Sequence, residues 1–362
     1  MAVIDADTHV HENDDTWAYL DESERRYRPE KGETTGHDDG SPIGYWLVDG
    51  VSRIRAIRKD NQTYTTAGTR ELTDVDARVR FMDQMGVDVQ VIYPTLFLST
   101  GFGRSEVELA LLRSYNRWMA DRCQKSAGRL RWVMLPPLQT MDKAIEELRF
   151  AKEHGACGIL KKGDPEGGHW PAEPHFFPLY EEAERLGLPI CFHVGSGTAE
   201  PMPLDRLAYF SFHKIILSTV HAFQTLITFQ IPNKFPGLRW GFVEANSSWV
   251  PFVLYHMKRI LAKNAEHQGV TRFMSGSDYQ IPQSALADNN IYVTCQVDED
   301  LPYIIKHAGE DQLMVGSDYT HHDTGEELHF LKRLEERAES GEISHAAVRK
   351  ITSENPRKFY GL

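Results

Sequence analysis

The chain has few of the features that mark several common classes of protein. Only four cysteines occur in 362 residues and no two form a CxxC pair, which argues against a disulfide framework or a zinc ribbon. No apolar run approaches the roughly 20 residues that span a bilayer. Basic residues number 40 against 52 acidic ones, and the net charge of −12 lacks the cationic footprint of nucleic-acid binding.

These absences narrow the expected partners and compartment. The opening residues show no basic segment followed by an apolar one, so a secretory signal is not predicted and a cytoplasmic protein is expected. The expected partner is a small-molecule substrate, with no nucleic acid and no membrane. The cysteines are predicted to be buried thiols: Cys123, Cys157, Cys191 and Cys295.

Eight short apolar or β-branched runs are present, and segments of helical periodicity separate several of them. Such helical segments cover 105–128, 140–156 and 177–187. Strand and helix repeated eight times predict an α/β fold, a (β/α)8 TIM-like barrel. The strands are expected at 2–10, 89–95, 130–137, 157–163, 188–195, 238–246, 290–298 and 312–319.

The repeat predicts one barrel domain over residues 1–362. Two segments do not fit it: 11–74 is interpreted as a long insertion after the first strand that covers the barrel mouth, and 262–290 as a smaller excursion. The alternative architecture is an open doubly wound sheet, but no GxGxxG follows the first strand.

Polar residues follow most of the predicted strands. Active sites of such barrels lie at the carboxyl ends of the strands, where these side chains would converge. Without a divalent cation, converging carboxylates and imidazoles would repel one another or stay unpaired. Zinc, iron and manganese all suit such a set of ligands. The candidate ligands are Asp7, His9, His11, His193, Glu244, Asp318 and His322.

Several motifs, taken in order, resemble the amidohydrolase superfamily. They are DADTHVHE, PICFHVGSG, FPGLRWGFVEA, GSDYTHHD and the terminal ENPRKFYGL. Within the superfamily, the chain is similar to the branch of aminocarboxymuconate semialdehyde decarboxylase and related aromatic acid decarboxylases. The resemblance covers nearly the whole chain apart from the two excursions.

The resemblance implies a metal set that agrees with the strand ends. It places ligands on Asp7, His9, His193 and Asp318, with Asp318 also accepting the proton of an attacking water. One departure is Glu244, which stands where many decarboxylases of this branch carry a histidine. A carboxylate is a different ligand and base from an imidazole, so the departure weakens the decarboxylase interpretation.

More candidate ligands exist than one ion needs. Glu244 with His11 and His322 would suit a second ion about 3.5 to 4 Å from the first. The alternative is that the additional histidines donate hydrogen bonds to the primary ligands. A further alternative is a carboxylated lysine that bridges two metals, because Lys161 and Lys162 end the fourth run.

The leading hypothesis is a metal-dependent hydrolase of an amide, ester or thioester. Metal-bound water would attack the substrate, with Asp318, Glu244 and His193 as catalytic residues. The first alternative is a nonoxidative decarboxylase of an aromatic or unsaturated acid, which needs a cationic anchor such as Arg206, His221 or one of the two lysines.

Two further alternatives complete the set. One is an oxygenase with two iron ions, or manganese and iron, as in a few relatives of this branch. The other is a barrel that serves only as a scaffold. Weaker candidates for the substrate pocket are His221, Lys161 and Tyr93. The expected assembly is a homodimer or an oligomer of related subunits.

Overall fold

Eight parallel strands form one sheet in the computed structural model of the chain. The model describes residues 1–35, 42–55, 60, 63–196, 216–266, 281, 284–322 and 324–362. Neighbouring strands of this sheet follow one another along the chain. They are β1 (Ile4–Val10), β5 (Val89–Pro94), β6 (Leu130–Met134), β7 (Ala156–Lys162), β8 (Ile190–His193), β9 (Trp240–Val243), β10 (Ile291–Cys295) and β11 (Leu313–Val315).

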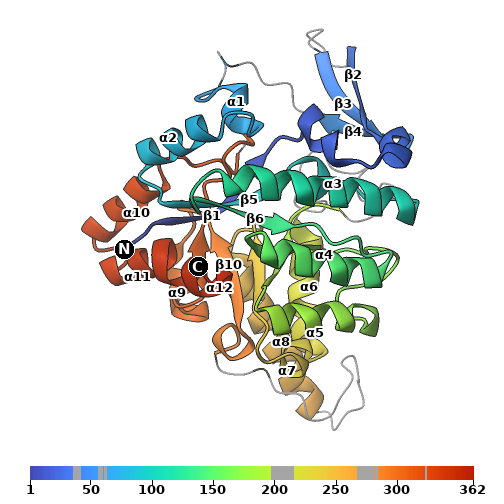
Figure 1. The fold of residues 1–362 in the computed structure, drawn as a ribbon. Coiled ribbons are helices and arrows are strands. Elements are labelled where there is room, and N and C mark those ends of the chain that lie inside the picture. The colour runs from blue at the N-terminus through green and yellow to red at the C-terminus, as the bar shows by residue number, and fades with distance from the viewer. Residues whose placement is uncertain are drawn as a thin grey trace.

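The first and last strands meet and bring the sheet close to a full barrel. Thr8 of β1 forms a parallel bridge with Tyr319, just beyond β11. The amide of Asp318 also donates to the carbonyl of Asp7 at 3.0 Å. With helices between and around the strands (Figure 1), this arrangement confirms the predicted barrel.

Helices follow most of the strands, as the alternating pattern predicts. The longest between strands are α2 (Val75–Met85), α3 (Ser105–Gln124), α4 (Met141–Glu153), α5 (Phe177–Leu186), α6 (Leu217–Thr228), α8 (Trp249–Glu266), α9 (Leu301–Ala308) and, after β11, α10 (Phe330–Glu339). Shorter ones are α1 (Ala67–Arg70), α7 (Ile231–Lys234), α11 (His345–Arg349) and α12 (Asn355–Tyr360).

The eight barrel strands are buried at every position except the half-buried Val89 and Arg131, which explains their largely apolar composition. β1 differs in composition, because it carries Asp5, Asp7 and His9. All seven of its residues are nevertheless buried. The end of the chain packs against this strand: Tyr360 of α12 donates its hydroxyl hydrogen to the carbonyl of Ala6 at 2.7 Å. Burial of so many polar groups requires that each has a partner or a ligand.

The segment between β1 and α2 contains a small antiparallel sheet. Its strands are β2 (Glu30–Thr35), β3 (Pro42–Val48) and β4 (Val51–Arg55). Two 3₁₀ helices, η1 (Asp14–Tyr19) and η2 (Glu22–Tyr27), pack beside α3 (Figure 1). β4 approaches the turn η4 (Leu96–Leu98), which follows β5, so the insertion borders the barrel mouth.

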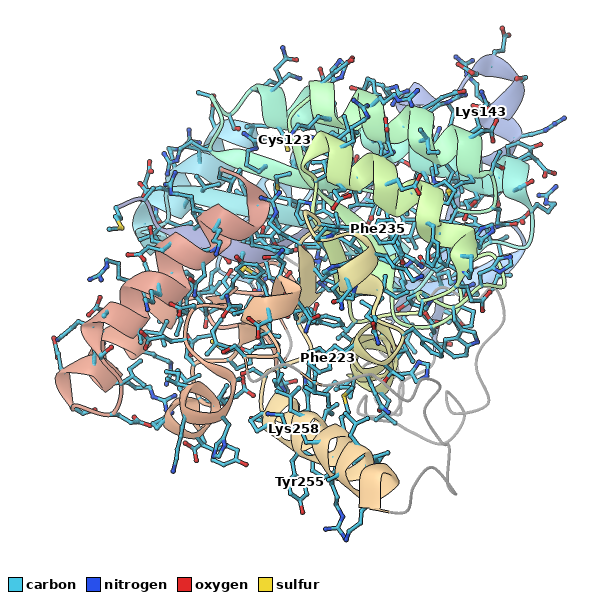
Figure 2. The ribbon with its side chains drawn as sticks, turned by 90° about the horizontal axis from the view of Figure 1, so that it is seen from below. Cys123, Lys143, Phe223, Phe235, Tyr255 and Lys258 are labelled. Carbon is cyan, nitrogen blue, oxygen red and sulfur yellow. The ribbon has the colours of Figure 1, made fainter. Side chains whose placement is uncertain are left out.

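The second predicted excursion falls mostly outside the described residues, since only 262–266, 281 and 284–290 of it are described. Helix α8 leads into it and carries Tyr255 and Lys258, which Figure 2 labels. Phe252 and Tyr255 are 68% and 61% exposed on this helix. Within the described part of the chain, we find no helix with the length and apolar content to cross a membrane.

Candidate metal centre

The Nε2 atom of His9 faces a set of carboxylates. Its Nδ1 lies 2.9 Å from the carbonyl oxygen of Pro94 and therefore donates, because a carbonyl only accepts. In the neutral ring the lone pair is then on Nε2. That atom lies 3.3 Å from Asp7 Oδ1, 3.5 Å from Glu244 Oε2 and 3.2 Å from Asp318 Oδ1.

His193 repeats the arrangement from the end of β8. Its Nδ1 lies 3.0 Å from the carbonyl oxygen of Val194, which again assigns the proton to Nδ1. Its Nε2 faces Asp7 Oδ1 at 3.4 Å and Glu244 Oε2 at 3.1 Å. Two imidazole lone pairs and several carboxylate oxygens therefore point at the same small space.

The backbone is strained where two of the carboxylates enter this space. Glu244 follows β9 directly with φ of 61°, and Asp318 lies three residues beyond β11 with φ of 52°. Left-handed backbone costs a non-glycine residue roughly 1 to 3 kcal/mol and persists at functional sites where surrounding structure holds it. Here the amide of Glu244 donates to Thr294 Oγ1 at 2.8 Å, which helps to hold the turn.

The pKa shifts of the side chains around this space show that a positive charge is stabilised there. Burial raises the pKa of Glu244 to about 7, and the neighbouring Asp318 adds to the rise. Burial lowers the pKa of His9, but its three carboxylate neighbours outweigh burial and raise it well above 6.5. Burial also opposes ionisation of Asp7, yet His193 and His9 hold its pKa below the ordinary value.

A divalent cation fits this demand. Among the described residues, His9 Nε2, Glu244 Oε2 and Asp318 Oδ2 are buried without a hydrogen-bond partner. An uncompensated buried carboxylate is costly, and a bound ion would accept all of these lone pairs at once. Imidazole nitrogen and carboxylate oxygen together suit zinc, iron and manganese.

Two overlapping groups of ligand atoms share the site. In each group, the candidate atoms lie within 4.8 Å of one another, and His9 and Glu244 belong to both. Asp7 and His193 complete the first group, whereas Asp318 and His321 complete the second. His321 was not among the predicted ligands, although its spacing of three residues from Asp318 allows a contact across one turn.

His321 is held tightly beside Asp318. Its Nδ1 lies 2.8 Å from Asp318 Oδ1, and its Nε2 lies 3.3 Å from Thr95 Oγ1. The ring stacks on that of His9 with centroids 3.7 Å apart. His321 therefore contacts ligands of both groups.

The structure brings five of the seven predicted metal ligands together and leaves two outside. His11 Nε2 faces the carbonyl of Thr320 at 3.2 Å, and His322 Nδ1 faces Glu326 Oε2 at 2.9 Å. Neither belongs to a candidate ligand group among the described residues. The histidine that reaches the site is His321, the other member of the doublet.

The predicted pocket residues lie in different places. The Tyr93 ring is 4.8 Å from that of His193, while its hydroxyl pairs with Tyr360 at 2.8 Å. Lys161 is fully buried, with its ammonium 3.8 Å from the centre of the Phe176 ring, and it donates to Glu166.

His221 lies in a separate groove of about 620 Å³ between α5 and α6, next to Trp170. Arg206 lies outside the described residues.

The sequence profile of the amidohydrolase family matches residues 4–362. The chain belongs to this family. It is therefore an enzyme of the amidohydrolase superfamily.

Individual relatives are distant in sequence and similar in fold. A 2-amino-3-carboxymuconate-6-semialdehyde decarboxylase of Dictyostelium discoideum is 22% identical over 252 residues, which are 68% of this chain and 66% of that protein. The crystal structure of an amidohydrolase from Mycobacterium avium subsp. paratuberculosis has a TM-score of 0.74 at 18% identity, covering 99% of both chains.

A second solved structure is a dihydroxybenzoic acid decarboxylase from a Polaromonas species, with bound manganese and the inhibitor 2-nitroresorcinol. It has a TM-score of 0.64 at 19% identity and covers 100% of this chain and 97% of the other. The Dictyostelium and Polaromonas relatives are both named as decarboxylases. The prediction that this chain hydrolyses an amide, ester or thioester is therefore wrong, and its first alternative agrees better with the relatives.

Proposed function

We propose that the chain is a metal-dependent, nonoxidative decarboxylase of a carboxylic acid. The observation that carries the proposal is the convergence of Asp7, His9, His193, Glu244 and Asp318 on one buried space. The decarboxylase names of the relatives support the reaction class. A divalent cation bound there would hold the carboxylate and withdraw electrons from the acid.

The ligand side chains need little reorganisation for this task. His9 and His193 are fixed by Nδ1 bonds to main-chain carbonyls, so both Nε2 atoms already point inward. Asp7 lies on β1, which pairs with β5 along one edge and with the segment after β11 along the other. Such preorganisation stabilises the charge of the reacting acid better than mobile groups do.

Decarboxylation replaces a carbon–carbon bond with a carbon–hydrogen bond, so the acid releases CO2 and the carbon takes one proton. We assign that proton to Asp318, which His321 contacts at 2.8 Å. Burial opposes ionisation of Asp318, yet His321 and His9 hold its pKa below the ordinary value, so the proton reaches the carbon from His321 by way of Asp318. His321 can return a proton to Asp318 after each turnover.

The test measures CO2 release without oxygen. Manganese-loaded protein is incubated anaerobically with a panel of hydroxybenzoic and unsaturated acids in D2O. We expect one CO2 for each acid consumed and one deuterium on the carbon that lost the carboxylate. Acids that remain intact with manganese, zinc and iron each loaded in turn would refute decarboxylation for that panel's chemical class.

A second candidate function rests on the two overlapping ligand groups. Asp7 and His193 can hold one ion while Asp318 and His321 hold another, with Glu244 shared between them. His9 Nε2 has one lone pair and can bind only one of the two ions. Two iron ions, or manganese and iron, would then support oxygen chemistry, and oxygen consumption coupled to substrate loss would distinguish this from decarboxylation.

Three sequence-based expectations enter this proposal unchanged. Residues 1–362 form one domain, the segment 11–74 covers the mouth, and the chain assembles as a homodimer or with related subunits. The contact between β4 of this segment and η4 supports the expectation that the segment covers the barrel mouth. Sedimentation of the metal-loaded protein tests the assembly.

A further inference from the structure

A small cavity lies at the carboxyl ends of three barrel strands. The turns after β5, β6 and β7 and the start of α3 line it, and its volume is about 30 Å³. Lys162 is the last residue of β7 and pairs in register with His193 of β8. Neighbouring strands lie about 4.8 Å apart, so the cavity wall adjoins a metal ligand.

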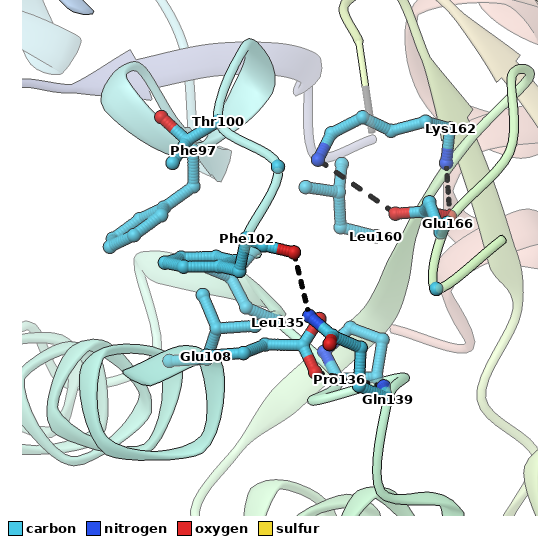
Figure 3. A pocket seen from close by; sticks show the side chains of 13 residues that line it. Phe97, Thr100, Phe102, Glu108, Leu135, Pro136, Gln139, Leu160, Lys162 and Glu166 are labelled. Atoms are coloured by element: carbon cyan, nitrogen blue, oxygen red, sulfur yellow. Dashed lines mark hydrogen bonds and ion pairs between the residues drawn. The ribbon is translucent and has the colours of Figure 1, made fainter. Parts of the chain in front are cut away.

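The two lysines at the end of β7 differ in their surroundings. Lys161 donates to Glu166 and lies over the Phe176 ring. Lys162 lines the cavity instead, and Figure 3 shows its side chain extended past Leu160 toward the turn that carries Thr100. Alternation along a strand requires this difference, because neighbouring side chains leave on opposite faces.

The ammonium of Lys162 lacks a close partner among the described residues. Its side chain is 6% exposed, and its ion pair with Glu166 is long, with 3.8 Å between Nζ and Oε1, beyond hydrogen-bond distance. The other oxygen of Glu166 already accepts from Lys161 and from the amide of Lys162. With three donors and only this long ion pair among the described residues, the Lys162 ammonium can still donate to a ligand.

The other walls of the cavity are largely apolar. Phe97, Phe102, Leu135 and Leu160 supply apolar surface. Glu108, the second carboxylate of the wall, already accepts from the amide of Gln139 at 2.8 Å. A volume of about 30 Å³ holds roughly two water-sized groups, as many as the two oxygens of a carboxylate.

From these observations we propose that Lys162 determines substrate specificity by binding a second acidic group of the substrate. The substrate class is then a dicarboxylic acid with an apolar or aromatic body. One carboxylate reaches the metal ligands, and the other enters the cavity and accepts hydrogen bonds from Lys162. This inference rests on the proposed function for the role of the first carboxylate.

The experiment compares two acids that differ by one carboxylate. Isothermal titration measures the dissociation constants of benzoate and isophthalate with manganese-loaded protein. We expect isophthalate to bind about 10- to 100-fold more tightly, as a charged hydrogen bond predicts. Lys162→Met should abolish this preference, and Lys162→Arg should restore part of it. Lys234→Met is the matched control, because Lys234 lines the separate groove near His221.

The preference of the unmodified protein tests the inference even if a variant fails to fold. Equal binding of the two acids, or a preference that survives in Lys162→Met, would overturn it. The titration does not depend on turnover. Selective binding of isophthalate without CO2 release from any acid would therefore remove the proposed function and retain the role of Lys162.

Discussion

His9 Nε2 lies 3.2 Å from Asp318 Oδ1, while the opposite nitrogen of the same ring donates to the carbonyl of Pro94. A neutral His9 therefore turns a lone pair toward a carboxylate. The contact is stable only if a positive charge lies between the two groups or a proton joins the ring. The site as a whole has three carboxylates and two such rings, which a divalent cation stabilises more completely than one proton.

Loss of a primary ligand should remove the metal-dependent part of the stability. Asp7→Asn keeps the shape of the side chain but withdraws its charge from both histidines. At a metal concentration 100 times the dissociation constant, the unmodified protein should gain about 2.7 kcal/mol in unfolding free energy. The variant should gain almost none at the same manganese concentration, measured by urea denaturation with and without the metal. An equal gain in both proteins would exclude Asp7 as a ligand.

The histidine doublet offers a matched pair of variants. His321 contacts Asp318 at 2.8 Å, whereas His322 contacts Glu326. His321→Ala should weaken manganese binding about 10- to 100-fold, the usual effect of removing a group that orients metal ligands. His322→Ala should leave the dissociation constant within about threefold. A competition titration against a chelator measures both dissociation constants. If His322→Ala weakens manganese binding more than His321→Ala does, His322 is the metal-site histidine, as the sequence predicted.

Gly316 should be essential for the position of Asp7. A Cβ atom added there would lie 2.2 Å from Asp7 Cβ and 2.8 Å from its backbone nitrogen. Gly316→Ala should therefore cost about 1 to 3 kcal/mol of stability and displace the ligand. Gly103→Ala is the control, because no atom lies within 4 Å of the added Cβ. Similar manganese affinities in the two variants would contradict this account of Asp7.

Glu108 should make stability depend on pH. Burial raises its pKa from the ordinary 4.5 to about 7 in the folded protein. Between these values the folded state holds a proton that the unfolded state releases, so the stability contribution falls as pH rises from 4.5 to 7 and is constant above. Glu108→Gln should remove this loss, which is about 3 kcal/mol at most. Urea denaturation of both proteins from pH 5 to 8 measures it, and parallel curves would refute the shift.

The sequence was sufficient to predict the strands because most of them are apolar runs buried in the nearly closed sheet. Each of the eight predicted runs overlaps an observed strand. Several observed strands end earlier than predicted, since polar residues such as Glu244 and Asp318 leave the sheet in left-handed turns. Those turns bring the side chains together, and strand periodicity does not describe them.

The early ends of the strands and the turns that follow them also explain which site residues the sequence did not predict. Alternation places His11 on the side of His9, but β1 ends at Val10, and the amide of His11 donates to Arg70 instead of continuing the sheet. Beyond Asp318 the chain turns, so the sequence alone could not decide between the two histidines of the doublet. For the lysine pair, alternation showed that only one faces inward, and the contact of Lys161 with Phe176 identifies Lys162 as that one.

The most direct test of the metal centre is a crystal structure of the protein grown with manganese, with data collected on both sides of the manganese absorption edge. We expect an anomalous peak about 2.0 to 2.2 Å from His9 Nε2, His193 Nε2 and an oxygen of Asp7, the range for such ligands. A second peak between Asp318 and His321 would establish the two-ion arrangement. A saturated protein whose anomalous peaks all lie more than about 4 Å from His9, His193 and Asp7 would contradict the account.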